Sequence, residues 1–115
     1  MQQVQKDTGI FIFSTPLIEG YQIDEYFGLV HGASIQGVHF LKDAMAYLSD
    51  KFGGRVHGYE SSLEKAMEQA VHDMARKALK MGANAILGVH VNTNEVGNRM
   101  LMASCYGTAV RFHRK

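Results

Sequence analysis

The sequence contains one cysteine, one proline and no tryptophan, and it has no long apolar run. A single cysteine, Cys105, excludes an internal disulfide and a cysteine-rich zinc site. The polar N-terminus lacks the apolar core of a signal peptide, and no apolar run approaches the ~18 residues of a membrane-spanning helix. We therefore expect a reduced, cytoplasmic protein without a membrane partner.

Charge of one sign is also missing, because twelve basic and eleven acidic side chains leave a net charge of +1. This balance gives no general attraction to a phosphate backbone, so we expect no nucleic-acid partner. The 115 residues, 46% of them hydrophobic, suit a single domain with one modest core. Residues 1–8 are polar, and we expect them to form a flexible N-terminal segment of that domain.

Four segments are predicted to be strands. "GIFIF" (9–13) is β-branched and aromatic, and "YQIDEYFGLVHGASIQG" (21–37) contains glycines that predict a bent or bulged strand. "NAILGVHVN" (84–92) and "RMLMASCYGTAVRFH" (99–113) are separated by the turn-like "TNEVGN" (93–98), which predicts an antiparallel hairpin.

Two segments have helical spacing of apolar residues, at residues 40–52 and at about residues 60–81. The second carries glutamates toward its start and basic side chains toward its end, as the helix dipole favours. The resulting order is β-β-α-α-β-β. It predicts an α+β fold in which an antiparallel four-stranded sheet packs against two helices.

The last strand has two different faces. One row is mostly small and lets a helix approach closely: Leu101, Ala103, Cys105, Gly107 and Ala109. In this row Cys105 reads as a small buried side chain and not as a nucleophile. The other row would expose Met100, Met102, Tyr106, Val110 and Phe112 if the chain stayed alone. Such a patch favours self-association in closed symmetry, and the alternative is that the first strand region folds back over it.

The connector "FGGRVHGYE" (52–60) combines three glycines with polar chemistry. Gly53 and Gly54 can end the first helix, and the guanidinium of Arg55 can bind a carboxylate or a phosphate. Arg55 and Glu60 can instead pair with each other or across a subunit boundary, with Tyr59 beside them. Both interpretations stay open, and the connector lacks the pattern of a nucleotide phosphate loop.

Taken in order, "GIFIFSTPLIEGYQIDEYFGLVHG", "FGGRVHGYE", "MGANAILGV" and "MLMASCYGTAV" resemble the YbjQ-like family, which is named for heavy-metal binding. The resemblance runs from about Ile10 to Val110. It implies a dodecin-like α+β fold, a homopentameric ring and no established reaction. Among the motif residues it carries over Arg55, Tyr59, Glu60 and Asn84 as candidates for a ligand site or an interface.

The histidines are not part of that motif, so a metal bound by them would be a property of this chain. His31, His39, His57 and His90 are the metal candidates. A zinc, copper or nickel ion needs three or four donors, which copies of one histidine around a ring axis could supply. Glu68 and His72, one helical turn apart, instead read as a solvated surface pair.

Three hypotheses about function follow. The first is a homo-oligomeric binding module that accepts a divalent or heavy-metal ion or a small ligand at a subunit interface. The second is an enzyme that uses Glu60 as acid or base and Arg55 as an anion clamp. The third is a purely structural assembly module. The sequence favours the binding module over the enzyme and assigns no catalytic residue.

Overall fold

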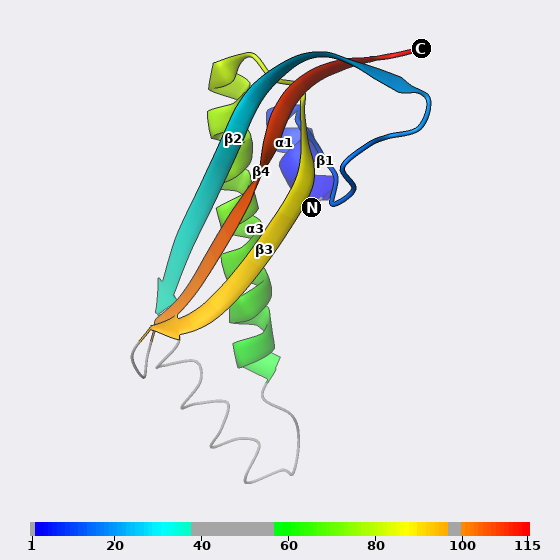
Figure 1. Cartoon of the computed structure of the whole chain (residues 1–115). Coiled ribbons are helices and arrows are strands. Elements are labelled where there is room, and N and C mark those ends of the chain that lie inside the picture. The colour runs from blue at the N-terminus through cyan, green and yellow to red at the C-terminus, as the bar shows by residue number, and fades with distance from the viewer. Residues whose placement is uncertain (1, 38–56, 97–99) are drawn as a thin grey trace, which may run out of the picture.

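A computed structural model gives the structure of residues 2–37, 57–96 and 100–115 (Figure 1). The elements are α1 (Gln2–Thr8), β1 (Phe11–Ile12), β2 (Tyr21–Gly37), α3 (His57–Met81), β3 (Ala85–Val96) and β4 (Met100–Arg114). The helix expected at residues 40–52 lies outside the described residues, as do His39 and Arg55. Among the helices that are described, none is long and apolar enough to cross a membrane.

The four strands form one sheet in the order β1-β3-β4-β2. β4 is antiparallel to both of its neighbours, as the predicted hairpin requires, but β1 pairs with β3 in parallel. The prediction of a wholly antiparallel sheet is therefore wrong at this edge. The direction of β1 relative to β3 depends on the path of the chain through β2 and α3, which lie between Phe11 and its partner Ala85. The local sequence pattern around β1 does not encode that path.

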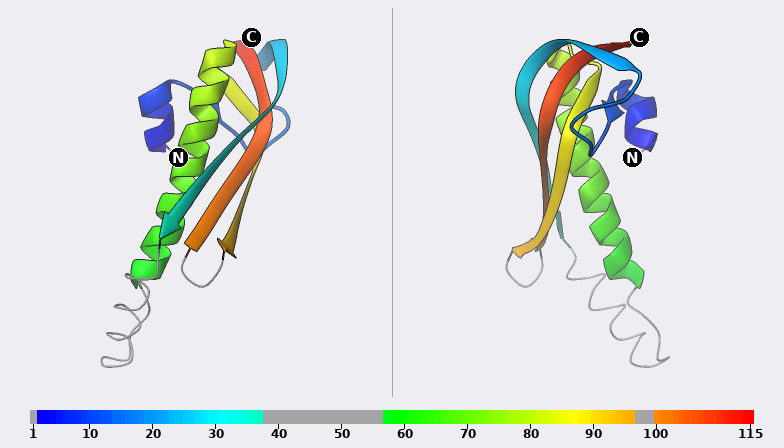
Figure 2. Two further views of the ribbon diagram at one scale, coloured as in Figure 1. Left: turned by 90° about the vertical axis from the view of Figure 1, so that its left-hand side faces the viewer. Right: turned by 45° about the vertical axis from the view of Figure 1, so that its right-hand side comes forward.

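α3 confirms the predicted second helix and packs along one face of the sheet (Figure 2). Its apolar stripe is buried, including Ala66, Ala70 and Met74. Its backbone comes very close to β2, because a Cβ built on Gly32 would lie 2.2 Å from the carbonyl oxygen of Ala70. Glycine at this position is therefore a condition of the packing of α3 on the sheet.

Gln2–Thr8 of the N-terminal segment forms a helix that was not predicted from the sequence, and this helix packs on α3. Val4 is fully buried in the core, and Ile10 follows it there. The hydroxyl of Thr8 donates to the carbonyl oxygen of Val4 at 2.7 Å and accepts from the N–H of Ile10 at 3.2 Å. A single buried valine in a polar segment is too weak a periodic signal to reveal this helix from sequence.

β2 is bulged, as its glycines predict. Its register with β4 shifts between Ile23 and Glu25 and again between Tyr26 and Gly28. Gly28 has a φ of 100°, a left-handed conformation that glycine adopts without strain. The bulges add to the curvature with which β2 and β4 bend over one end of the molecule (Figure 1).

The small-residue row of β4 faces α3, as predicted, with Leu101, Ala103, Cys105 and Ala109 buried in the main core. Part of the opposite row is not exposed, which corrects the expectation for two of its members. Val110 and Phe112 are buried in a second cluster with Ala85 and Leu87. Phe13, Ile18, Tyr21 and Ile23 pack against this cluster, so the first strand region does fold back over this end of the face.

Candidate functional site

The rest of that face is uncovered within the described residues, and we call it the outer face. The strand registers place the following side chains on it: Tyr26, Leu29, His31, Ala33 and Ile35 of β2; Met100, Met102, Ser104, Tyr106 and Thr108 of β4; His90, Asn92 and Asn94 of β3. Figure 1 views the sheet from this side, with α3 behind it.

Five large hydrophobic side chains of the outer face are exposed. The exposed fractions are 73% for Leu29, 65% for Tyr26, 58% for Ile35, 45% for Tyr106 and 39% for Met100. Single exposed apolar residues are ordinary on a protein surface, but these five lie on two adjacent strands of one sheet. The outer face is thus an apolar surface and not a scatter of separate residues.

Two histidines lie in the middle of the outer face, on either side of Tyr106. The register pairs His31 of β2 with Tyr106 of β4, and Tyr106 with His90 of β3. The rings of His90 and Tyr106 are stacked, with centroids 5.3 Å apart and planes inclined by 20°. The three side chains therefore form a row across three strands.

The outer face carries no Asp, Glu, Lys or Arg among the residues defined above. Its only ionisable side chains are the two histidines and the two tyrosines, Tyr26 and Tyr106. The charged groups of the same strands lie elsewhere, for example Arg111, which donates to the carbonyl oxygen of Gly82 at the end of α3. An uncharged, partly aromatic surface of this kind has the composition of an interface core.

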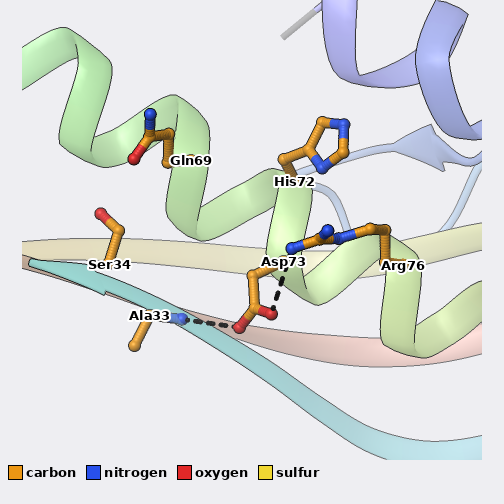
Figure 3. A pocket seen from close by; sticks show the side chains of 6 residues that line it. All are labelled: Ala33, Ser34, Gln69, His72, Asp73 and Arg76. Atoms are coloured by element: carbon orange, nitrogen blue, oxygen red, sulfur yellow. Dashed lines mark hydrogen bonds and ion pairs between the residues drawn. The ribbon is translucent and has the colours of Figure 1, made fainter.

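A polar cleft lies on the other side of β2, between this strand and α3 (Figure 3). It has a volume of about 270 Å³ and is lined by Ala33, Ser34, Gln69, His72, Asp73 and Arg76. The sequence analysis did not find this cleft. In the sequence, the indication of this cleft is the helical spacing of Gln69, Asp73 and Arg76 on the polar side of α3.

Polar groups along the cleft are already engaged with one another. The carboxylate of Asp73 accepts from the N–H of Ala33 at 3.2 Å and lies 3.3 Å from the ammonium of Lys77 and 3.8 Å from the guanidinium of Arg76. The hydroxyl of Ser34 donates to the carbonyl oxygen of Ala66 at 2.6 Å. These contacts attach the edge strand β2 to α3, which gives the cleft a structural role.

The pKa of Asp73 records the same contacts. Partial burial alone would raise it, but the Ala33 N–H bond and the charges of Lys77 and Arg76 outweigh burial and lower the pKa of this carboxyl below its ordinary value of 3.8. Asp73 is therefore ionised at neutral pH and is unsuited to act as a general base there.

Two described histidines outside the outer face, His72 and His113, have carboxylate partners. His72 Nε2 lies 3.5 Å from the carboxylate of Asp7, and His113 Nδ1 lies 2.7 Å from that of Asp24. The predicted Glu68–His72 pair lies beside the cleft, where both side chains line a second surface depression. By contrast, the imidazole rings of His31 and His90 form no hydrogen bond or ion pair with another described residue, although the ring of His90 stacks on Tyr106.

Cys105 lies in the main core beneath α3 and is buried. Burial raises the pKa of its thiol from 9.0 to about 11, and the thiol lies 3.7 Å from the carbonyl oxygen of Gly32, to which it donates. The thiolate is the nucleophile and the metal ligand, so Cys105 is suited to neither role at neutral pH.

Asn84, a candidate from the family motif, is fully used inside the fold. Its side-chain amide donates to the carbonyl oxygen of Phe112 and accepts from the N–H of Phe112, both at 2.9 Å. Its backbone N–H donates to Val110 and its carbonyl accepts from Phe11. Asn84 thus joins the beginning of β3 to the end of β4 and to β1.

The remaining candidates are placed only in part. His57, Tyr59 and Glu60 lie in the first turns of α3, but their side chains lie outside the described structure. In the described part of one chain, no three His, Cys, Asp or Glu side chains converge as a metal site would require. The donors that suit a metal by chemistry are the exposed imidazoles of His31 and His90, and each stands alone.

Comparison with known proteins gives a family and no reaction. Residues 10–113 match the YbjQ_1 family, described as "Putative heavy-metal-binding". A UPF0145 protein of Clostridium botulinum is 48% identical over 103 residues, which are 88% of this chain and 97% of that protein. A UPF0145 protein of Listeria monocytogenes is 45% identical over 103 residues, which are 88% of this chain and 94% of that protein.

A solved structure shows a similar fold. It is a protein of unknown function from Pediococcus pentosaceus, placed in the DUF74 family, and it matches with a TM-score of 0.62 at 21% identity. The match covers 91% of this chain and 99% of that one. Because the family model spans nearly the whole sequence, the chain belongs to the YbjQ-like, UPF0145 family.

Proposed function

We propose that this chain is a subunit of a cytoplasmic homo-oligomer, a ring of five copies, that holds a metal ion or a small ligand where subunits meet. The observation that carries the proposal is the outer face, with five exposed large hydrophobic side chains and no charged ones. The ring of five rests on the family resemblance. The apolar face supports association of copies and does not set their number.

The composition of the outer face supports a protein partner. Interface cores are depleted in charge and enriched in Tyr and Met, and Tyr26, Tyr106, Met100 and Met102 all lie here. The same face is already sealed at one end by Phe13, Ile18, Tyr21 and Ile23 of the chain itself. A second copy carries the same apolar face and can cover it, and closed symmetry limits the size of such an assembly.

The polar side chains of the outer face support a bound ligand at the boundary between copies. His31, His90, Asn92 and Asn94 lie among the apolar residues and would be covered with them. A buried polar group needs a hydrogen-bond partner or a ligand, since an unsatisfied one costs about 1–3 kcal/mol. Association would therefore bury these polar groups, and a bound ligand would satisfy those that find no hydrogen-bond partner in the neighbouring copy.

Native mass spectrometry with elemental analysis of the untagged, purified protein tests the proposal. It should give a mass of five times the 12.8 kDa chain. Leu29→Lys should shift the distribution to single chains, because a charge buried at the interface is strongly unfavourable. Circular dichroism of this variant should match the parent, since Leu29 is 73% exposed in one chain.

The matched control is Gln22→Lys, which adds the same charge to an exposed position of β2 that is not part of the outer face. This variant should keep the parental mass. A parent protein that remains a single folded chain at micromolar concentration would overturn the proposal. Equal dissociation of both lysine variants would show that net charge, and not the outer face, governs association.

A further inference from the structure

We infer that His31 and His90 bind a divalent transition-metal ion in a site that is completed by the same residues of a neighbouring copy. The inference rests on the proposed association through the outer face and names the ligand residues and the class of ion. It concerns histidines that lie outside the motif shared with the family.

The first step is that one chain cannot complete the site. His31 and His90 lie on strands separated by β4, so their Cα atoms are about 9–10 Å apart at the usual strand spacing. The side chain of Tyr106 stands between them and is stacked on His90. Zinc-bound nitrogens lie about 2.0–2.1 Å from the ion, and a zinc site has three or four protein donors. His31 and His90 supply at most two, and no cluster of three donors forms in the described part of one chain, so a neighbouring copy must supply the rest.

The second step is that these imidazoles are available. His72 and His113 face the carboxylates of Asp7 and Asp24, whereas His31 and His90 have no such partner in the described part of the chain. Both are exposed and sit at the centre of the apolar surface. Covering them with a second copy would desolvate their ring nitrogens, and coordination by an ion would satisfy those nitrogens.

The third step concerns the surroundings. Among the described residues of the outer face there is no lysine or arginine to repel a cation, and no aspartate or glutamate to pair with a protonated imidazole. Neutral imidazole suits Zn²⁺, Ni²⁺ and Cu²⁺. A thiophilic ion would need a thiolate, and the buried thiol of Cys105 does not supply one at neutral pH. The donor set therefore selects nitrogen-binding divalent ions.

The test uses the untagged protein, stripped with a chelator and titrated with Zn²⁺ in a calorimeter, with native mass spectrometry of every sample. The variants are His31→Gln, His90→Gln and both together. The matched control replaces His72 and His113 by glutamine. The parent should bind no more than one ion per chain, because each site takes donors from at least two chains and a ring of five copies has five equivalent boundaries. Each single variant should weaken binding at least about tenfold, the size of effect typical near metal sites, and the control should bind like the parent.

The outcomes separate this inference from the proposed function. A parent that is a single chain would overturn both. An assembled parent that binds no Zn²⁺, or whose binding survives the double variant, would overturn this inference and leave assembly standing. A control that loses binding equally would also overturn it.

A second measurement covers the case in which the histidine variants fail to assemble. Electron paramagnetic resonance of the assembled parent loaded with Cu²⁺ should show hyperfine coupling to nitrogen. A signal without nitrogen coupling would overturn the inference without any substitution.

Discussion

The fifteen residues of β4 alternate between two faces of the sheet, and one face is buried while much of the other is exposed. On the inner face Ala103, Cys105 and Ala109 are 0–2% exposed beneath α3. On the outer face Tyr106 and Met100 are 45% and 39% exposed, although both are as large and apolar as core residues. The difference shows that apolar content alone does not define the core of this chain. What defines it is which face the helix and the N-terminal segment cover.

The side of the sheet opposite α3 also differs along its length, with one end covered and the rest exposed. At the end of β4, Phe112 stacks on Tyr21 with ring centroids 4.8 Å apart and is 7% exposed. Further along the strand, no described segment lies over Tyr106. The described residues of one chain thus bury this face at one end only, and in the function proposed above another copy covers the rest.

The largest difference in stability is expected between substitutions at neighbouring positions on the two faces of β2. Gly32→Ala should cost about 3 kcal/mol or more of unfolding free energy, because the new Cβ would lie 2.2 Å from the carbonyl oxygen of Ala70. Ala33→Ser, at the next position on the outer face, should change it by less than about 0.5 kcal/mol. Urea unfolding at several protein concentrations measures both. Similar losses for the two variants would contradict the assigned faces.

Substitutions at two neighbouring residues of β4, one on each face, should separate stability from association. Leu101→Ala should lower the unfolding free energy by about 2–4 kcal/mol, since Leu101 is 1% exposed against the helix side. Met100→Ala should change it little in dilute solution but should weaken association. Native mass spectrometry beside urea unfolding separates the two effects. A larger stability loss for Met100→Ala would reverse the roles given to the faces.

Asn84→Ala tests the covered end of the outer face. It removes both bonds to the backbone of Phe112 and leaves the N–H and carbonyl of Phe112 without their side-chain partner. The expected cost is about 1–3 kcal/mol. Asn84→Asp keeps the acceptor for the Phe112 N–H and should recover part of that loss. Thermal unfolding followed at Tyr21, which stacks on Phe112, provides a local readout.

The smallest expected effect concerns the edge of β2. The folded pKa of Asp73 lies below its ordinary value, so its contribution to stability is complete above about pH 4 and is lost as the pH falls through the folded pKa. Asp73→Asn should therefore cost up to about 1 kcal/mol at pH 7, because the carboxylate is partly exposed. The gap between parent and variant should narrow as the pH falls below 3.8. A gap that widens on acidification would contradict this assignment.

Much of this fold follows from local patterns. The stripe from Leu63 to Met81 predicts α3, and the small row of β4 predicts which side of that strand the helix covers. The glycines of β2 predict its bulges, and Gly28 lies at one of them. These features depend on residues close together in sequence, where spacing is informative.

The parts that the sequence did not reveal depend on distant partners. The parallel pairing of Phe11 with Ala85, and the cover of Phe112 by Tyr21, join segments whose mutual position no periodicity encodes. The dual hydrogen bonding of Asn84 is equally invisible, because an asparagine after a helix reads as a loop residue or a ligand. His31 and His90 were singled out as donors, but their shared face became clear only from strand register.

The protonated, enclosed thiol of Cys105 has a practical consequence, because it is the sole cysteine of the chain. Maleimide should not react with this thiol at neutral pH. A cysteine introduced on the surface would then be the single labelled position. Fluorophore pairs placed this way could report distances between copies without first removing a native sulfur.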